Sequence, residues 1–337
     1  MKKGYKIRYI LSFIILSFIL TIPNFINISA SYKVILGGEN IGMELNGKGL
    51  IVSSTTTIHY NDLSYNPSID DDINVGDLIY SIENNEINSI NDLEKIISEF
   101  KNEVNRVNVK IIRNNNKISK KLNIYKIDNV YKTGLFVKEK ILGIGTLTFI
   151  DPNNNKYAAL GHEVRDSDYK EIYPLESGNI FESKVTGIKS SKNGDPGEKI
   201  AQINKKSILG TIDKNTIYGI YGNYKGESNN DLIEISDKVN KGKAFIRTQL
   251  DDNQIKEYEI DITEVREQKN KNTKGFSFKV TDQVLLNKTN GIIQGMSGSP
   301  IIQDNKLIGA VTHVIVDNCH YGHGIYIRFM LDEINSI

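Results

Sequence analysis

Between Tyr32 and Ile127, apolar and polar residues alternate with a period of two over several short stretches. Alternation of this kind predicts β-strands that bury one face. The triplet Asn114–Asn116 is typical of a hairpin turn between the last two stretches. The predicted strands are 41–45, 49–52, 77–82, 108–113 and 118–125.

One helix is predicted after Ser89, a residue that can cap a helix N-terminus. Asp92 follows three residues on, where a carboxylate favours the positive end of a helix. The next apolar residues recur at helical spacing and form a single apolar face. They are Leu93, Ile96, Ile97 and Phe100.

From residue 128 onward, short alternating or apolar runs are separated by turn signals, and no repeat of 20–50 residues is found. This spacing predicts a second, nearly all-β domain, either a barrel or a sandwich. The turn signals lie at 152–155, 177–178, 190–197, 222–230 and 304–305.

The first 30 residues have the three regions of a secretory signal. Basic residues up to Arg8 precede an apolar run over 10–22, and Ile28-Ser29-Ala30 offers small residues near a cleavage point. The apolar run is shorter than the ~20 residues of a spanning helix. A cleaved signal and a retained membrane anchor both remain open, and either implies export.

The composition argues against a nucleic-acid-binding protein and against a small domain held together by disulfides. The chain has 337 residues with 42 Lys+Arg against 41 Asp+Glu, so its net charge of +1 gives no field to attract nucleic acid. Cys319 is the only cysteine and cannot close an intrachain disulfide. The length favours two domains.

The most informative string runs from Gly291 to Thr312 and contains Gly295-Met296-Ser297-Gly298. A nucleophilic serine in acyl transfer needs a tight turn whose N–H groups converge on the carbonyl oxygen, and flanking glycines allow one. A glycine-rich hairpin with exposed serines is the alternative.

His162, in Ala159-Leu160-Gly161-His162, supplies a base that could take the serine proton and return it to the leaving amine. A third residue, a carboxylate, should orient the imidazole. Asp282 lies shortly before Ser297 and Asp213 lies about 50 residues after His162, and spacing alone favours Asp213 in a chymotrypsin-like layout.

Cys319, His320 and His323 have a spacing that could ligate a metal, but a fourth ligand is missing from the motif. We therefore predict no metal and no cofactor. His59 and His313 are interpreted as ordinary polar positions.

Residues 75–87, which begin Val75-Gly76-Asp77, resemble the corresponding run of PDZ domains of bacterial proteases. Such domains bind an extended peptide by strand addition and hold its terminal carboxylate in a hydrophobic-Gly-hydrophobic loop. The best match for that loop is Ile41-Gly42-Met43.

Taken together, 143–152, 159–162, 210–216 and 291–312 resemble the stage IV sporulation protein B family of serine peptidases. The resemblance implies a mainly β chain with three parts: a signal or anchor over 1–30, a PDZ domain over 31–127 and a chymotrypsin-like double β-barrel over 128–337. The family's triad falls on His162, Asp282 and Ser297. The oxyanion hole is expected from the backbone N–H groups of Gly295 and Ser297.

The resemblance also implies a function in endospore formation. Such peptidases cleave themselves in the N-terminal region and cut a membrane-bound regulator, so that an intramembrane protease activates a sigma factor. The expected location is the space between the forespore and mother-cell membranes, with the N-terminal segment contacting the membrane. The rival interpretations are a non-catalytic PDZ-containing scaffold and a zinc hydrolase using the Cys319–His323 motif.

Overall fold

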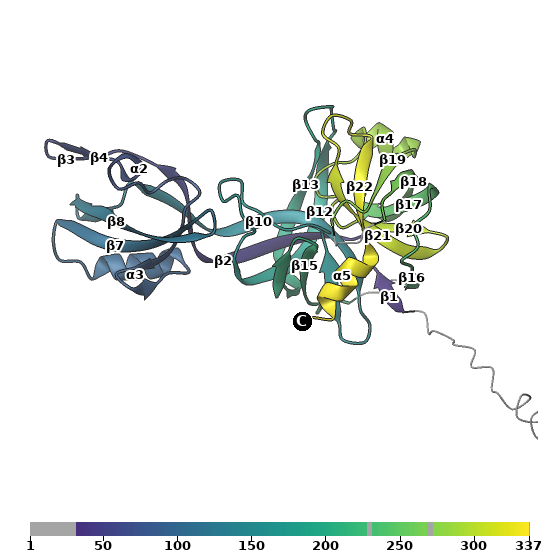
Figure 1. The fold of residues 1–337 in the computed structure, drawn as a ribbon, viewed down its shortest axis with the longest axis horizontal. Coiled ribbons are helices and arrows are strands. Elements are labelled where there is room, and N and C mark those ends of the chain that lie inside the picture. The colour runs from purple at the N-terminus through teal and green to yellow at the C-terminus, as the bar shows by residue number, and fades with distance from the viewer. Residues whose placement is uncertain (1–31, 228–230, 268–271, 337) are drawn as a thin grey trace, which may run out of the picture. The chain divides into compact units, whose positions relative to one another are not determined.

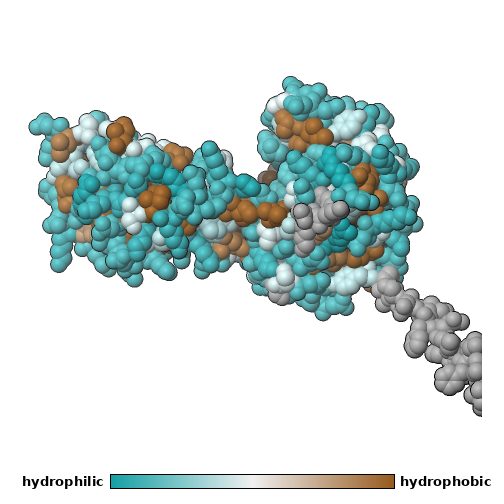
Figure 2. All heavy atoms as spheres, in the orientation of Figure 1, coloured by the Kyte–Doolittle hydropathy of each residue, from teal (hydrophilic) through white to brown (hydrophobic). Residues whose placement is uncertain are grey.

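The computed structural model describes residues 32–227, 231–267 and 272–336, so the predicted signal over 1–30 lies outside the described residues. Strands dominate the described chain, which confirms the mainly β prediction. No described helix is long and apolar enough to cross a membrane. The face shown in Figure 2 is largely hydrophilic, with scattered apolar patches.

The predicted PDZ segment forms a small β domain with one amphipathic helix, α3 (Figure 1). Its own apolar core contains buried residues such as Leu50, Ile79 and Ile111. The elements are β3 (Ile58–Tyr60), β4 (Leu63–Tyr65), α2 (Pro67–Asp70), β5 (Leu78–Ile82), β6 (Asn85–Glu86), α3 (Ile90–Ser98), β7 (Val104–Arg113), β8 (Asn116–Ile127) and β9 (Val130–Lys132).

Two local predictions are confirmed here. Ser89 caps α3 in a capping box: its hydroxyl accepts from the backbone N–H of Asp92, whose side chain accepts from the N–H of Ser89. Asn114 and Asn115 both have positive φ and form the turn between β7 and β8. Short polar side chains tolerate this left-handed backbone better than most residues do.

The second domain is built on long antiparallel strands and has two separate apolar cores. Its elements are β1 (Lys33–Leu36), β2 (Asn40–Thr55), β10 (Leu135–Ile150), β11 (Lys156–Ala159), β12 (Leu175–Lys189), β13 (Glu198–Thr211), β14 (Lys214–Thr216), β15 (Gly219–Asn223), β16 (Leu232–Ile235), β17 (Gly242–Gln249), β18 (Ile255–Val265), β19 (Phe276–Val280), α4 (Gln283–Thr289), β20 (Pro300–Gln303), β21 (Lys306–Val314), β22 (Tyr321–Tyr326) and α5 (Ile327–Ile334).

Strands β2 and β10 belong to both domains. They pair antiparallel from Leu135 opposite Thr55 to Thr146 opposite Asn40, and the second half of β2 also pairs with β5. The first half of β2 instead pairs with β12 and buries Ile41 and Leu45 in the second domain. The chain between 33 and 47 thus differs from the predicted boundary at 31, because its apolar residues fit the second domain's core.

Candidate active site

Ser297 lies in a tight turn between α4 and β20. Gly295 and Gly298 flank it with φ of +91° and +90°, values that L side chains rarely adopt. A Cβ at Gly298 would lie 2.1 Å from the carbonyl oxygen of Thr146. Glycine is therefore required at 298 both by its φ and by the lack of space.

Two threonines of β10 hold this turn against the sheet. The hydroxyl of Thr146 donates to the carbonyl of Gly295 at 2.8 Å, and that of Thr148 donates to the carbonyl of Gly298 at 2.7 Å. The backbone N–H of Thr146 donates to the carbonyl of Ser297 at 2.9 Å. The serine is thus placed by a strand that lies about 150 residues earlier in the sequence.

The pocket beside the turn is lined by Ser297, His162 and Gly295 together, and its volume is ≈ 280 Å³. Within the described part of the chain, no hydrogen bond occupies the backbone N–H of Gly295 or of Ser297. Unoccupied N–H groups next to a serine hydroxyl can stabilise a developing oxyanion.

The hydroxyl of Ser297 donates to the carbonyl of Thr312 at 3.1 Å. It therefore points to β21, and not to the imidazole, in this structure. Since a serine hydroxyl rotates about one bond, it can exchange this acceptor for a neighbouring one.

His162 follows β11 after two residues with positive φ, Leu160 and Gly161. Its Nδ1 lies 2.8 Å from the backbone carbonyl of Glu163. Because a carbonyl oxygen only accepts, Nδ1 carries the proton and Nε2 is left as the acceptor, as a general base requires. Burial lowers the pKa of His162 below its ordinary value of 6.5, with the Glu163 contacts opposing this.

His313 faces His162. The two ring centroids are 5.2 Å apart with the planes at 39°. Burial, together with the neighbouring His162, lowers the pKa of His313 to about 4, so the ring is neutral at physiological pH. Its Nδ1 is buried and has no hydrogen-bond partner among the described residues.

Comparisons with known proteins now identify the family. The family model for the SpoIVB peptidase S55 matches residues 129–331, and a PDZ domain model matches residues 41–124. The chain belongs to the SpoIVB peptidase S55 family. It is thus a serine peptidase of this family with a PDZ domain before the peptidase domain, which confirms the resemblance stated from the sequence.

Solved structures give a more distant likeness. The Rv3671c protease from M. tuberculosis in its active form is 11% identical, covers 58% of this chain and 74% of its own, and has a TM-score of 0.33. An inactive serine-to-alanine form of the same protease is 9% identical over 58% of this chain and 82% of its own, with a TM-score of 0.31. No curated protein matches the chain.

Neither candidate carboxylate contacts His162 among the described residues of this S55 peptidase. Asp282 is the N-cap of α4, and its side chain accepts from the backbone N–H of Leu285 at 2.9 Å. Asp213 accepts from the side-chain amide of Asn223 at 2.7 Å. The structure therefore brings together His162 and Ser297, and the acid of the triad stays a prediction.

Asn215 positions the histidine loop and was not assigned a role from the sequence. Its side chain accepts from the N–H of Val164 at 2.8 Å and donates to the carbonyl of Val164 at 2.9 Å. It also donates to the carbonyl of Tyr173 at 3.3 Å. The residue lies in the string 210–216 that contributes to the family resemblance, but only the fold shows which loop it holds.

Lys199 supports the loop that precedes Ser297. Its Nζ is buried and donates to Asn40 at 2.6 Å and to Thr248 at 2.9 Å. Its backbone N–H donates to the carbonyl of Gln294, and its aliphatic stem lies 3.1 Å from where a Cβ of Gly295 would be. Burial without a carboxylate partner lowers the pKa of this amine to about 7.

The predicted carboxylate loop of the PDZ domain requires a correction. Ile41, Gly42 and Met43 lie inside β2, where β10 pairs with one edge and β12 with the other. Both apolar side chains are buried in the peptidase domain. This stretch is a central barrel strand and not an open loop, because its backbone groups are used by its two neighbours.

The residues of the Cys319–His323 motif point to different partners. The thiol of Cys319 donates to the carbonyl of Asn290, and His320 bonds to the side chain of the same asparagine. His323 bonds to the hydroxyl of Ser277. No group of three potential metal ligands occurs in the described part of the chain.

Proposed function

We infer that the chain is an endopeptidase in which Ser297 is the nucleophile and His162 the general base. The observation that carries this is the shared pocket of Ser297, His162 and the unoccupied N–H groups of Gly295 and Ser297. Each requirement of acyl transfer has a group within this pocket.

The proposed steps are those of acyl transfer to a serine. Nε2 of His162 takes the hydroxyl proton while Oγ of Ser297 attacks the carbonyl carbon, and the two N–H groups receive the oxyanion. The imidazolium then gives its proton to the leaving amine. Water, deprotonated by the same nitrogen, hydrolyses the acyl-enzyme and restores the serine.

The carbonyl of Glu163 takes over one part of the usual carboxylate role, since it fixes the tautomer of His162. The neutral ring of His313 lies against the ring of His162. Asp282 and Asp213 are retained as triad candidates from the sequence, and substituting each by asparagine would separate them.

The test labels the purified full chain with a fluorophosphonate and follows self-cleavage on a gel. Ser297→Ala and His162→Ala should each lose on the order of 10⁶ in rate. Ser299→Ala and His320→Ala are matched controls and should keep both signals. Absence of labelling and cleavage in the wild-type chain would favour the non-catalytic scaffold.

The biological role we propose is that of the family. The exported chain acts between the forespore and mother-cell membranes, cleaves itself and cuts a membrane-bound regulator of an intramembrane protease. The support is the family assignment together with the signal-like pattern of residues 1–30. In a spore-forming host that lacks its own copy, the wild-type gene should restore a sigma-factor-dependent reporter, whereas Ser297→Ala should not.

A further inference from the structure

Strand β10 has one edge that is largely unpaired. β2 and β1 cover its first edge along its whole length. On the second edge, pairing with β11 begins only at Leu147, and no other described strand pairs with residues 135–145 there. Proteins usually cover or shorten such edges because a free edge invites another strand.

The PDZ end of this edge runs beside α3. The backbone N–H of Ile90, at the start of α3, donates to Glu139 of β10 at 2.8 Å. The hydroxyl of Tyr131 donates to the carbonyl of Phe100, just after the end of α3, at 2.7 Å. The start of the helix is therefore held at Glu139 of β10 and its end at Tyr131 of β9, so α3 runs antiparallel to the chain between these two residues.

The apolar face of α3 is only half covered. None of its residues is buried, although Leu93 and Ile97 join the same apolar cluster as Leu135 and Val137. An amphipathic helix beside a free strand edge, with its apolar face still accessible, is the arrangement in which PDZ domains receive a peptide strand.

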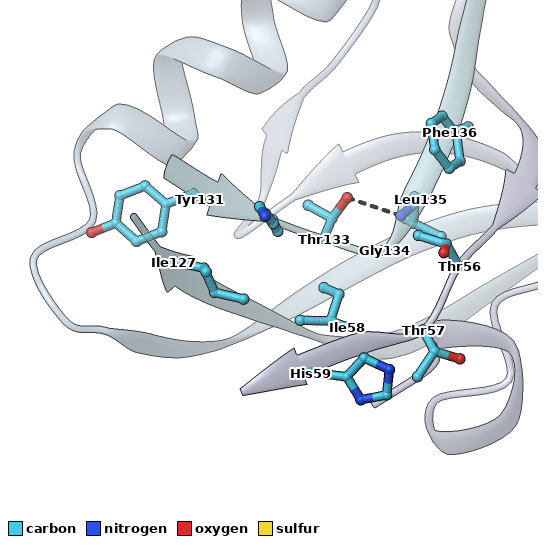
Figure 3. A pocket seen from close by; sticks show the side chains of 11 residues that line it. Thr56, Thr57, Ile58, His59, Ile127, Tyr131, Thr133, Gly134, Leu135 and Phe136 are labelled. Atoms are coloured by element: carbon cyan, nitrogen blue, oxygen red, sulfur yellow. Dashed lines mark hydrogen bonds between the residues drawn. The ribbon is translucent and has the colours of Figure 1, made fainter. Parts of the chain in front are cut away.

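The loop that leads into β10 can receive a terminal carboxylate. Gly134 has a φ of +73°, and the hydroxyl of Thr133 accepts from the N–H of Leu135 at 3.1 Å (Figure 3). Exposed Lys132 brings a positive charge to the same loop. A pocket of ≈ 540 Å³ lies beside this loop and residues 56–59. Thr133-Gly134-Leu135 thus has the glycine and the positive charge expected of a carboxylate loop, and a bound carboxylate would replace the Thr133 hydroxyl as the acceptor for the N–H of Leu135.

The other end of the free edge reaches the active site. Leu142, Gly143 and Ile144 line both the 280 Å³ pocket of Ser297 and a neighbouring pocket of ≈ 340 Å³. The side chain of Leu142 is 56% exposed. At Thr146 the edge ends, because its N–H donates to the carbonyl of Ser297.

We propose that a protein substrate with a free C-terminus adds as a strand along this edge, with its carboxylate at Thr133–Leu135, and that β10 thereby sets which peptide bond reaches Ser297. Because the carboxylate lies at the N-terminal end of β10, the substrate strand runs antiparallel to it. The proposal rests on the proposed peptidase function and adds the substrate class and the position of the cut.

The register gives the distance. From Leu135 to Ile144, paired residues advance about 3.4 Å each, which places the active site roughly 30 Å along the strand. The cleaved bond should therefore lie about ten residues before the C-terminus. Both irregularities of the β2–β10 ladder place more residues in β2 than in β10, where only Glu139 is skipped.

The experiment uses the full chain and peptides that share one cleavable sequence, taken from a site that the chain cuts in casein. Gly/Ser spacers place the C-terminus about 4, 7, 10, 13 or 18 residues beyond the cut, a range from less than half to almost twice the length of the free edge. Each peptide is made as the free acid and as the amide. Cleavage should be fastest near ten residues, and about tenfold faster for the acid than for the amide.

Binding is measured separately with the inactive Ser297→Ala chain by fluorescence anisotropy. The free acid should bind about tenfold tighter than the amide, and Gly134→Val should remove this difference, because valine is strained at the positive φ of that loop. Gly242→Val, at another positive φ, should keep it and controls for backbone strain alone, because Gly242 has open space, whereas a Cβ at Gly134 would meet Pro67 and Thr56 within 2.9 Å.

Casein cleavage separates the two proposals. The proposed fixed distance between the bound C-terminus and the cut is called the ruler. If casein is cut but the peptides show no dependence on spacer or C-terminal charge, the ruler is wrong and the peptidase function remains. Equal binding of acid and amide by Ser297→Ala would also overturn the ruler. If neither casein nor any peptide is cut, the proposed function fails and the ruler with it.

Discussion

Asp282 offers the sharpest single test of the site, because its two interpretations predict opposite results for one substitution. In the structure its side chain caps α4 through the N–H of Leu285, and it lies 3.4 Å from the N–H of Glu259. Asparagine caps helices about as well as aspartate does, so Asp282→Asn should keep the helix. An asparagine in place of a triad aspartate, in contrast, leaves the histidine in the wrong tautomer.

The size of the effect distinguishes a triad aspartate from a helix cap. Loss of a triad aspartate costs about 10⁴ in kcat. Loss of an N-cap to alanine costs about 1 kcal/mol, or roughly 2–4 °C in Tm for a chain of this size. From the geometry we expect Asp282→Asn to label within a few-fold of the wild type. We expect Asp282→Ala to lose Tm but not labelling per folded molecule.

The assay is the rate of fluorophosphonate labelling, normalised to the folded fraction from a thermal unfolding curve at the same pH. Asp213→Asn is measured beside it as the second candidate acid. A loss of 10³ or more for Asp282→Asn with an unchanged Tm would refute the capping interpretation. It would mean that this carboxylate reaches His162 in the working enzyme.

Three other substitutions test the packing around the site. Gly298→Ala should abolish labelling and lower the yield of folded protein, because its Cβ would meet Thr146 and Leu160 within 2.4 Å; a labelled, stable variant would contradict the turn geometry. The pKa of His313 falls from 6.5 to about 4 on folding, so the unfolded chain takes up this proton first and stability is lost as pH falls from 6.5 towards 4. His313→Phe should therefore lose less stability than wild type between pH 7 and 5, measured as urea midpoints. The pKa of Lys199 falls from 10.5 to about 7, so its burial costs stability below pH 10.5, and most fully below pH 7. Lys199→Met should flatten the rise in urea midpoint between pH 7 and 9, and an unchanged slope would show that this amine is not the cause.

Local patterns in the sequence predicted what local physics determines. The capping box at Ser89 and the turn at Asn114 depend on neighbours within four residues, so the pattern was sufficient. The glycines around Ser297 reported a strained turn for the same reason. His162 and Ser297 were found because each lies in a short motif whose residue types match one chemistry.

The remainder depends on contacts between distant segments. Lys199 meets Asn40 across 159 positions, and nothing in either local sequence indicates that contact. The alternation over 41–45 predicted a strand, which is confirmed, but the resemblance to PDZ domains also placed a carboxylate loop at Ile41-Gly42-Met43. The loop assignment is wrong because β10 and β12 flank this stretch and leave it no free N–H for a ligand. His313 became notable only when folding placed its ring against that of His162.

The bond from Ser297 to the carbonyl of Thr312 bears on how the enzyme is controlled. A net hydrogen bond contributes about 1 kcal/mol, so turning the hydroxyl towards His162 slows the reaction by only about fivefold. Such a factor is far too small to keep a peptidase silent. The proposed strand addition predicts control at the level of substrate access instead, because the free edge of β10 runs from beside α3 to the Ser297 pocket. A peptide that binds the free edge of β10 near Leu135 without reaching Ile144 should then inhibit cleavage of substrates that bind there through their C-terminus. A peptide long enough to reach Ser297 should be cut.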